Sequence, residues 1–315
     1  MLVGLGLACC SGGTVIVDLP TPAAGLPVTT AISPTVSEVT NPSPQALTAM
    51  ATPSAELCTE TPVRVETTPT ATPVSQPSVV AASQQVHRSS VQVTTSDGVT
   101  ATVSLGSLLY LPRGYAQVQK NRWPLIVFLH GSEERGDDPD VLRTTGLPQA
   151  LEQGLDLPAL VLSPQCPLGM RWWQWTEALG ALLDRIESEY LVDRQRVYLT
   201  GFSMGAYGAW ALALRFPEHF AAMAPVAGGC DFRDDSIPAE ICDLKELPVW
   251  AFHGAQDTTV APRESENAVN ALRACGGDVR LTLYPNVDHI ASSEITYADR
   301  ALYGWLFDHT RASSQ

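Results

Sequence analysis

Positive charge is scarce in this sequence. Lys and Arg together number 19 against 33 Asp and Glu, which gives a formal net charge of −14. Residues 89–315 contain 28 acidic and 17 basic residues, a net charge of −11. An acidic surface repels phosphate backbones and anionic lipid headgroups. The charge therefore argues against nucleic acid or an anionic membrane surface as a partner, whereas it does not restrict a neutral substrate.

Metal-binding patterns are also missing. The seven cysteines include no Cys-x-x-Cys pair and no Cys/His cluster with zinc spacing, so we expect no structural metal. In an exported protein, Cys230 and Cys242 could bridge a loop, although the sequence does not prove this pairing. We expect Cys166 and Cys275 to be small buried apolar residues.

Long hydrophobic runs are absent as well. The apolar run at residues 1–10 is far too short to span a bilayer. It resembles the end of a secretory signal, because Leu7-Ala8 leads into Cys9-Cys10 as in a bacterial lipoprotein cleavage box. No Lys or Arg precedes the run, so the true start could lie upstream. We expect an exported protein, either a cell-envelope lipoprotein with its lipid on Cys9 or Cys10 or a secreted protein; an ordinary apolar N-terminus is the alternative.

A long segment has too few core-forming residues to fold. Residues 11–88 are rich in Pro, Thr, Ser, Ala and Val, and residues 19–88 hold 11 of the 24 prolines. No helical or alternating hydrophobic period is present, and no Phe, Trp or Tyr occurs there. This composition predicts a disordered or extended linker. The folded domain is therefore expected at 89–315, which is long enough for one α/β core.

Strand and helix patterns alternate through this domain. Turn signals at Asp97-Gly98 and Gly106 predict antiparallel strands at 99–103 and 107–111. Short apolar runs then predict further strands, and longer stretches with helical spacing follow most of them. We expect strands at 125–129, 159–162, 196–199, 221–226, 248–253 and 279–284, and helices at 147–152, 175–190, 206–214, 261–275 and 297–309. The alternation predicts the α/β class, with a mostly parallel sheet between helices and the chemistry at the carboxyl ends of the strands.

The stretch around Ser203 carries the strongest catalytic signal. Gly201-Phe-Ser203-Met-Gly205 lies between a predicted strand and a predicted helix, and it matches the Gly-x-Ser-x-Gly pattern of a nucleophile elbow. A serine on so sharp a turn has a strained backbone, so its neighbours need to be glycines. Alone, this pattern is weak, since a serine before a helix is more often an N-cap.

A serine nucleophile needs an imidazole base and a carboxylate that orients it. His289 follows the last predicted strand and is the best base, and Asp257 follows the strand before it and is the best acid. Asp288 is the rival acid, but adjacent residues rarely place a carboxylate against the next imidazole. The remaining histidines fit a base less well, because two brace strand ends and the others lie in the linker or far from the elbow: His130, His253, His87, His219 and His309.

The oxyanion hole requires two backbone donors. The N–H of Met204 directly follows the nucleophile and is the first candidate. The N–H of Ser132 follows His130-Gly131 at the end of the predicted strand 125–129 and is the second. Glu134 and Arg135 either form an ion pair that holds this loop or belong to a solvated charge run.

With these residues in hand, the chain resembles the α/β-hydrolase superfamily. Within it, the dienelactone-hydrolase and phospholipase/carboxylesterase branch, which includes polyhydroxybutyrate-depolymerase-like and feruloyl-esterase-like proteins, is the most similar. The order Ser203, Asp257, His289 agrees with that superfamily. The likeness covers nearly all of 105–309 and rests on 110–115, 124–131, 134–136, 163–167, 192–194, 196–205, 248–254 and Asp257. It implies an α/β-hydrolase fold and a serine esterase that forms an acyl-enzyme without metal or cofactor, acting on a small-molecule or polymer-borne ester.

Two positions depart from the pattern of these relatives. Ala206 replaces a second glycine after the elbow, and Asp288-His289-Ile290-Ala291-Ser292 replaces Gly-His followed by a polar residue and tryptophan. Two alternatives stay open. One is a serine peptidase of the same fold, since similar domains cleave peptides when fused to a propeller, although no repeat of propeller-blade length precedes the domain here. The other is a catalytically silent, surface-tethered binding module, which the altered histidine loop supports. Trp172, Trp173 and Trp175 could form a sugar or aryl platform, but we favour core packing for this cluster.

Overall fold

The computed structural model describes residues 81–94, 98, 100–115, 121–232 and 236–311. The chain divides into two units, Met1–Thr72 and Pro73–Gln315, and every described residue belongs to the second. The predicted signal or lipobox segment at 1–10 and most of the predicted linker at 11–88 lie outside the described residues. The linker does not extend to Arg88, however, because strand β1 begins at Ser83.

An eight-stranded sheet runs through the described domain in the order β1-β2-β4-β3-β5-β6-β7-β8. β1 and β2 are antiparallel to each other, β2 is antiparallel to β4, and the remaining neighbours are parallel. The mostly parallel sheet predicted from the sequence is confirmed. The strands are β1 Ser83–Thr94, β2 Thr100–Leu111, β3 Trp123–Leu129, β4 Leu160–Pro164, β5 Val192–Phe202, β6 Ala222–Val226, β7 Val249–Gly254 and β8 Val279–Tyr284.

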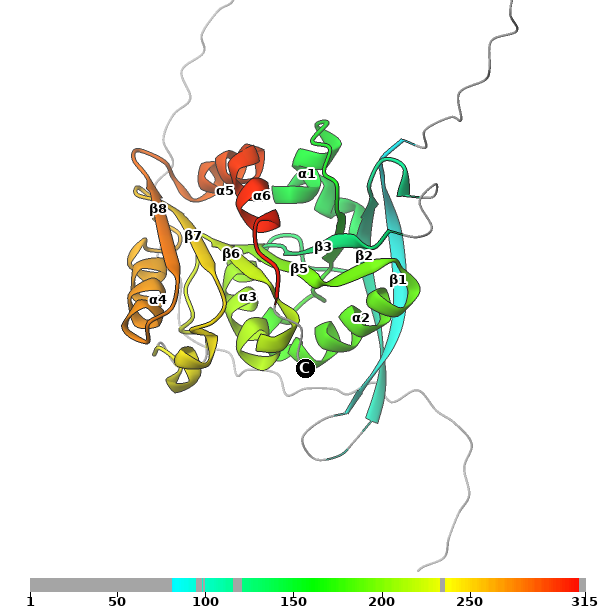
Figure 1. Cartoon of the computed structure of the whole chain (residues 1–315), viewed down its shortest axis with the longest axis horizontal. Coiled ribbons are helices and arrows are strands. Elements are labelled where there is room, and N and C mark those ends of the chain that lie inside the picture. The colour runs from blue at the N-terminus through cyan, green and yellow to red at the C-terminus, as the bar shows by residue number, and fades with distance from the viewer. Residues whose placement is uncertain (1–80, 95–97, 99, 116–120, 233–235, 312–315) are drawn as a thin grey trace, which may run out of the picture. The chain divides into compact units, whose positions relative to one another are not determined.

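Helices cover both faces of this sheet (Figure 1). α2, α3 and α4 lie on one face, and α1, α5 and α6 lie on the other (Figure 1). The α-helices are α1 Gly146–Glu152, α2 Thr176–Glu189, α3 Met204–Arg215, α4 Arg263–Ala274, α5 His289–Ala298 and α6 Arg300–Phe307. Short 3-10 helices, η2 Pro139–Thr144, η3 Trp172–Gln174, η4 Pro217–His219 and η5 Ala239–Leu244, lie in the connections.

Strand β3 illustrates how one apolar run serves two cores. Leu125, Val127 and Leu129 belong to the core beneath α2, α3 and α4, whereas Ile126 and Phe128 belong to the opposite core. All five side chains are at most 1% exposed. Because successive side chains of a strand point to opposite faces, a strand covered on both faces must be apolar throughout. The two cores together hold the strand ends, and therefore the loops after them, in fixed positions.

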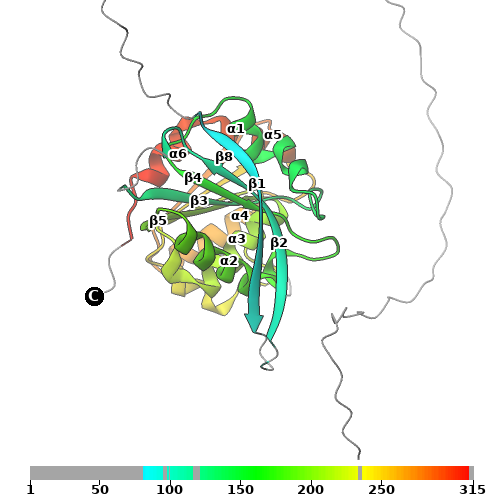
Figure 2. The ribbon, with the colours of Figure 1, turned by 90° about the vertical axis from the view of Figure 1, so that its right-hand side faces the viewer.

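The β1–β2 pair differs from the prediction. Gly106 does not turn the chain; β2 continues through it and pairs Gly106 with Arg88 of β1. A Cβ on Gly106 would lie 2.7 Å from Cγ of Pro139, so the glycine permits a close approach to η2. Figure 2 shows the two long strands at this end of the sheet. The outer part of β1 is mostly exposed and polar, which explains why its sequence looks like linker.

The C-terminal region also departs from the prediction. In place of one helix at 297–309 there are two, α5 and α6, separated at Asp299, whose carboxylate accepts the N–H of Ala301. His289 is not a loop residue but the first residue of α5. None of the helices among the described residues is long and apolar enough to cross a membrane.

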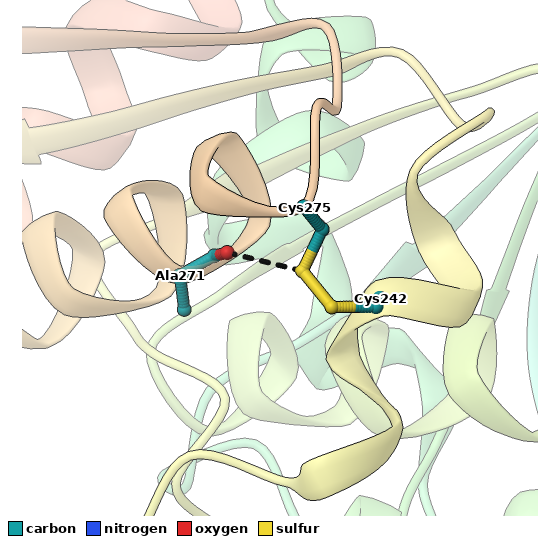
Figure 3. Close-up of a disulfide and its surroundings, with 3 residues drawn as sticks. All are labelled: Cys242, Ala271 and Cys275. Atoms are coloured by element: carbon teal, nitrogen blue, oxygen red, sulfur yellow. Dashed lines mark hydrogen bonds between the residues drawn. A yellow bond between two sulfur atoms is a disulfide. The ribbon is translucent and has the colours of Figure 1, made fainter.

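The disulfide differs from the pairing considered for the sequence. Cys242 of η5 is bonded to Cys275 at the end of α4, with their Cα atoms 5.3 Å apart (Figure 3). Cys230 and Cys166 are free and buried. The Cys230–Cys242 pairing and the expectation of an apolar role for Cys275 are therefore wrong, whereas Cys166 is buried as expected. The reason is tertiary, because η5 packs against the C-terminal end of α4.

Candidate active site

Ser203 occupies a strained turn between β5 and α3. Its backbone φ is +55° and ψ is −119°, a conformation that few residues other than glycine adopt. A Cβ on Gly201 would lie 2.2 Å from the carbonyl oxygen of Gly205, and a Cβ on Gly205 would lie 1.9 Å from that of Leu129. Both glycines are therefore required by close backbone contacts. The turn exposes the serine hydroxyl at the carboxyl edge of the sheet.

His289 lies within hydrogen-bonding distance of this hydroxyl. Its Nε2 atom is 2.9 Å from Oγ of Ser203. The His289 side chain is 11% exposed, and the ring of Phe202 packs against it with centroids 4.7 Å apart. Asp288 accepts the N–H of Ala291 and so caps α5, the helix on which His289 is the first residue. The rival acid considered in the sequence therefore serves as a helix cap.

Asp257 lies on the other side of the imidazole. Oδ2 of Asp257 is 2.6 Å from Nδ1 of His289, and Oδ1 accepts the N–H groups of Thr259 and Val260, both at 2.9 Å. The residue is 6% exposed and follows β7 directly. The structure thus brings the three residues predicted to be catalytic into one hydrogen-bonded chain. Their catalytic roles remain predictions.

His253 is a member of this group that the sequence analysis did not place there. Its Nε2 atom lies 3.1 Å from the same Oδ2 atom of Asp257 that contacts His289. The sequence interpretation, a histidine that braces the loop after its strand, describes only part of its contacts. The sequence feature that could have placed His253 beside Asp257 is their four-residue spacing across a tight turn.

The two predicted oxyanion donors line the cavity in front of Ser203. Ser132 and Met204 border, together with Ser203, a cavity of about 350 Å³. The guanidinium of Arg135 donates to the carbonyl oxygens of Ser132 (2.8 Å) and Met170 (3.4 Å), which ties the Ser132 loop to the loop before η3. Oε2 of Glu134 lies 3.6 Å from Nδ1 of His130. The loop is therefore held by these contacts, and no ion pair between Glu134 and Arg135 is found among the described residues.

The tryptophan cluster divides between core and cavity. Trp172 is fully buried and its indole N–H donates to the carbonyl of His130, as expected for core packing. Trp173 instead lines the cavity with Tyr207 and Phe232, and its ring centroid lies 6.4 and 6.1 Å from theirs. Trp175 packs against the core beside α2. Trp173 is also partly buried against the core, so core packing is confirmed for the cluster, and Trp173 in addition lines the cavity.

Two charged residues border the same cavity and were not singled out in the sequence. The guanidinium of Arg171 lies over the ring of Trp173, 5.3 Å from its centroid. Burial, together with a hydrogen bond to Glu264, raises the pKa of Asp231 from 3.8 to about 6. Burial likewise raises the pKa of Tyr207, so its phenol is neutral. Asp231 follows β6, so the rule that strand ends carry chemistry could have identified it.

The other histidines lie away from the Ser203 hydroxyl. Nε2 of His130 accepts the N–H of Cys166, so this side chain braces the loop as predicted. His87 belongs to β1 and not to the linker, His219 lies on η4, and His309 contacts Trp305 near the C-terminus. Within the described ranges, no group of three or more His, Cys, Asp or Glu side chains is arranged to hold a metal ion.

The family comparison matches the second half of the domain. A model of the dienelactone hydrolase family matches residues 170–301. The chain is 24% identical over 192 residues to a bifunctional acetylxylan esterase/xylanase of Neocallimastix patriciarum, which covers 57% of this chain and 27% of that protein. It is 28% identical over 105 residues to a putative carboxymethylenebutenolidase of Salmonella typhimurium, which covers 32% of this chain and 39% of that one. The chain therefore spans less than half the length of these relatives.

Solved structures agree with the fold. A thermostable esterase superimposes with a TM-score of 0.55 at 29% identity, over 71% of this chain and 63% of that one. The feruloyl esterase module of Clostridium thermocellum superimposes with a TM-score of 0.53 at 16% identity, over 73% of this chain and 91% of that one. The likeness to the feruloyl esterase module concerns the fold alone, whereas the thermostable esterase is similar in both fold and sequence.

Proposed function

We propose that this chain, which belongs to an esterase branch of the α/β-hydrolase superfamily, is a serine esterase that cleaves carboxylic esters through an acyl-enzyme. The observation that supports it most is the continuous chain of contacts from Ser203 Oγ to His289 Nε2 at 2.9 Å and from His289 Nδ1 to Asp257 Oδ2 at 2.6 Å. Such a chain lets an imidazole remove the serine proton while a carboxylate holds the ring and stabilises its charged form.

The reaction follows two steps in this proposal. Ser203 Oγ attacks the ester carbonyl as His289 takes its proton, and His289 then protonates the departing alcohol. A water molecule attacks the acyl-enzyme by the same route and releases the acid. The N–H groups of Met204 and Ser132 would donate to the oxyanion in both steps, each stabilising the transition state by about 3 kcal/mol. The mechanism requires no metal or cofactor.

The cavity suggests how the ester is held. Trp173, Tyr207 and Phe232 offer ring surfaces beside Ser203, with Arg171 and Asp231 at the same cavity. Rings favour flat or apolar groups, and the polar pair can bind hydroxyl or carbonyl groups. A small-molecule ester or an ester on a polymer both fit this description. Aryl, acetyl-sugar and hydroxybutyrate esters presented to the domain of residues 81–311 would separate these substrate classes.

A pair of serine variants tests the proposal. Ser203→Ala should lower turnover of a short p-nitrophenyl ester by about 10³-fold or more, because the nucleophile is lost. Ser188→Ala removes an exposed hydroxyl on α2 and should leave turnover unchanged. Circular dichroism checks that both variants fold. Full activity in folded Ser203→Ala would reject the mechanism.

An activity-based probe separates the esterase from the alternatives. A fluorophosphonate should label Ser203 in the wild type and leave Ser203→Ala unlabelled. Folded wild-type protein that stays unlabelled and inactive would indicate the silent binding module. Labelling with cleavage of peptides but not of esters would indicate the serine peptidase.

We also propose that the protein is exported, either as an envelope lipoprotein anchored at Cys9 or Cys10 or as a secreted protein. The Cys242–Cys275 disulfide supports this proposal, because disulfides persist mainly in oxidising compartments. Metabolic labelling with a radioactive fatty acid tests the anchor. Label that is lost in a Cys9→Ser/Cys10→Ser variant supports it, and unlabelled protein in the medium indicates simple secretion.

A further inference from the structure

His253 is a fully buried imidazole at the end of β7 that contacts three residues in two segments, the loop after β7 and helix α4. Its Nδ1 atom lies 2.7 Å from Oγ of Ser265 on α4. Its Nε2 atom lies 3.1 Å from Oδ2 of Asp257 and 3.0 Å from the carbonyl oxygen of Val260. The side chain is 0% exposed, so no solvent competes for these contacts. A buried imidazole this close to the predicted catalytic carboxylate calls for a chemical explanation.

The partners of Nε2 determine where its proton lies. A carbonyl oxygen and a carboxylate oxygen are both acceptors, so Nε2 must carry a proton to bind either of them. Nδ1 lies beside Oγ of Ser265, which is also 2.8 Å from the carbonyl oxygen of Gly228. The single hydroxyl proton of Ser265 goes either to Nδ1 or to Gly228, so Nδ1 is an acceptor in the first case and a donor in the second. Burial lowers the pKa of His253, while Val260 and Asp257 oppose that effect. Because burial favours the neutral imidazole, the contacts with Asp257 and Val260 place its single proton on Nε2, and Nδ1 then accepts the proton of Ser265.

This proton reaches the same oxygen that holds His289. Oδ2 of Asp257 receives Nδ1–H of His289 at 2.6 Å and Nε2–H of His253 at 3.1 Å. The other oxygen, Oδ1, receives the N–H groups of Thr259 and Val260. The carboxylate therefore has four donors and cannot rotate without losing several of them. Asp257 and His289 are the titratable groups that face His253, and α4 presents the hydroxyl of Ser265.

We propose that His253 is a positioning residue for the Ser203 reaction: its Nε2–H holds Oδ2 of Asp257 in place and limits the negative charge that this oxygen offers to His289. The inference rests on the proposed serine esterase function. A donor on Oδ2 competes with Nδ1–H of His289 for the same lone pairs. Loss of this donor would leave a more mobile carboxylate that favours the charged imidazolium more strongly.

Two polar variants of similar size separate positioning from mere support of the fold. His253→Gln can place an amide N–H where Nε2 lies and so keep the donor to Asp257. His253→Asn reaches only the position of Nδ1, so it keeps the contact with Ser265 and loses the one with Asp257. His253→Leu loses both. Tyr303→Phe removes a buried hydrogen bond from α6 to the carbonyl of Tyr297, near the C-terminal end of α5 and away from His289, and is the stability control.

The readout is the pH profile of the activity that depends on Ser203, with kcat and KM measured separately. In His253→Asn and His253→Leu, kcat should fall about tenfold with KM within about twofold of the wild type, as is typical when a residue that orients a functional group is lost. The acid limb of kcat/KM should move to higher pH, because His289 keeps its proton more readily. His253→Gln should keep the acid limb of kcat/KM at the pH of the wild type. Tyr303→Phe should lower Tm and leave the pH profile unchanged.

Identical acid limbs in the Asn and Gln variants would overturn the proposal and leave His253 with a structural role only. A spectroscopic test needs neither activity nor a substitution of His253. In Ser203→Ala labelled with 15N-histidine, His253 should carry its proton on Nε2. A proton on Nδ1 alone would overturn the proposal. If the proposed serine esterase function is wrong, Ser203→Ala will keep the turnover of the wild type. That result differs from those that would overturn the role of His253, so the two failures are distinguishable.

Discussion

Oγ of Ser203 lies 2.9 Å from Nε2 of His289, although 86 residues separate them in the chain. Ser203 is held by the turn after β5, and His289 by the loop between β8 and α5. β5 and β8 are parallel to the strands between them, so their carboxyl ends open at the same edge of the sheet. The contact therefore depends on the sheet, on the turn at Ser203 and on the start of α5, which Asp288 caps, and each of these parts can be tested.

Asp257 and Asp288 offer a matched comparison of two carboxylates near one imidazole. Asp257→Asn should lower kcat for a p-nitrophenyl ester by about 10⁴-fold, because an amide can hold the ring in the wrong tautomer. Asp288→Asn should keep kcat within about twofold, since asparagine caps a helix about as well as aspartate does. The assignment fails if the Asp288 variant is the more damaged of the two.

Alanine substitutions at Gly205 and Gly304, two glycines within helices, should have opposite effects on stability. Gly205→Ala should yield little soluble protein, because the added Cβ would lie 1.9 Å from the backbone oxygen of Leu129, which cannot move away. A Cβ on Gly304 of α6 meets nothing within 4 Å, so Gly304→Ala should stabilise the fold by about 0.5–1 kcal/mol through its helix propensity. Expression yield and thermal melts measure both. Wild-type yield and Tm in Gly205→Ala would contradict the geometry of the elbow.

The disulfide should contribute measurably to stability. Cys242 and Cys275 are 33 residues apart, and closing a loop of this length stabilises a fold by about 3–4 kcal/mol in the chain-entropy account. Reductant should therefore lower Tm of the wild type, and Cys242→Ser should melt at the reduced value with or without reductant. Peptide mapping of unreduced protein should recover Cys242 linked to Cys275. Recovery of Cys230 in a disulfide instead would show that the pairing is wrong.

Asp231 should make stability depend on pH. Burial and the hydrogen bond with Glu264 raise its pKa from 3.8 to about 6, so the folded chain binds more protons than the unfolded chain between these values. The stability associated with the protonated carboxyl is therefore full below about pH 4 and is lost as pH rises through about 6.

The variant Asp231→Asn is neutral throughout and avoids this loss. It should exceed the wild type in free energy of unfolding by about 1 kcal/mol at pH 7.5, a value reduced for solvent screening, and by much less at pH 4. Urea denaturation at the two pH values provides the measurement, with the exposed Asp243→Asn as the baseline. A gain of the same size at both pH values would contradict the raised pKa.

Much of the architecture could be predicted from the sequence because it depends on local patterns. Alternating apolar runs and helical periods were enough to predict the parallel sheet and its two layers of helices. Ser203, Asp257 and His289 could be selected because each follows a strand, and the carboxyl ends of parallel strands meet at one edge. The same reasoning failed for β1, whose exposed outer strand lacks a strong hydrophobic pattern, and for the single C-terminal helix, which Asp299 divides.

Only the tertiary structure decided which distant side chains meet. Cys242 pairs with Cys275 because η5 packs on the end of α4, a contact that no spacing in the sequence reveals. Trp172 and Trp173 are neighbours in sequence, yet one is buried in the core and the other lines the cavity of Ser203. His253 likewise acquires its position beside Asp257 from the turn after β7. The sequence by itself determined most of the elements and their order, because these follow from local periodicity. The partners of individual side chains follow from packing between elements far apart in the chain.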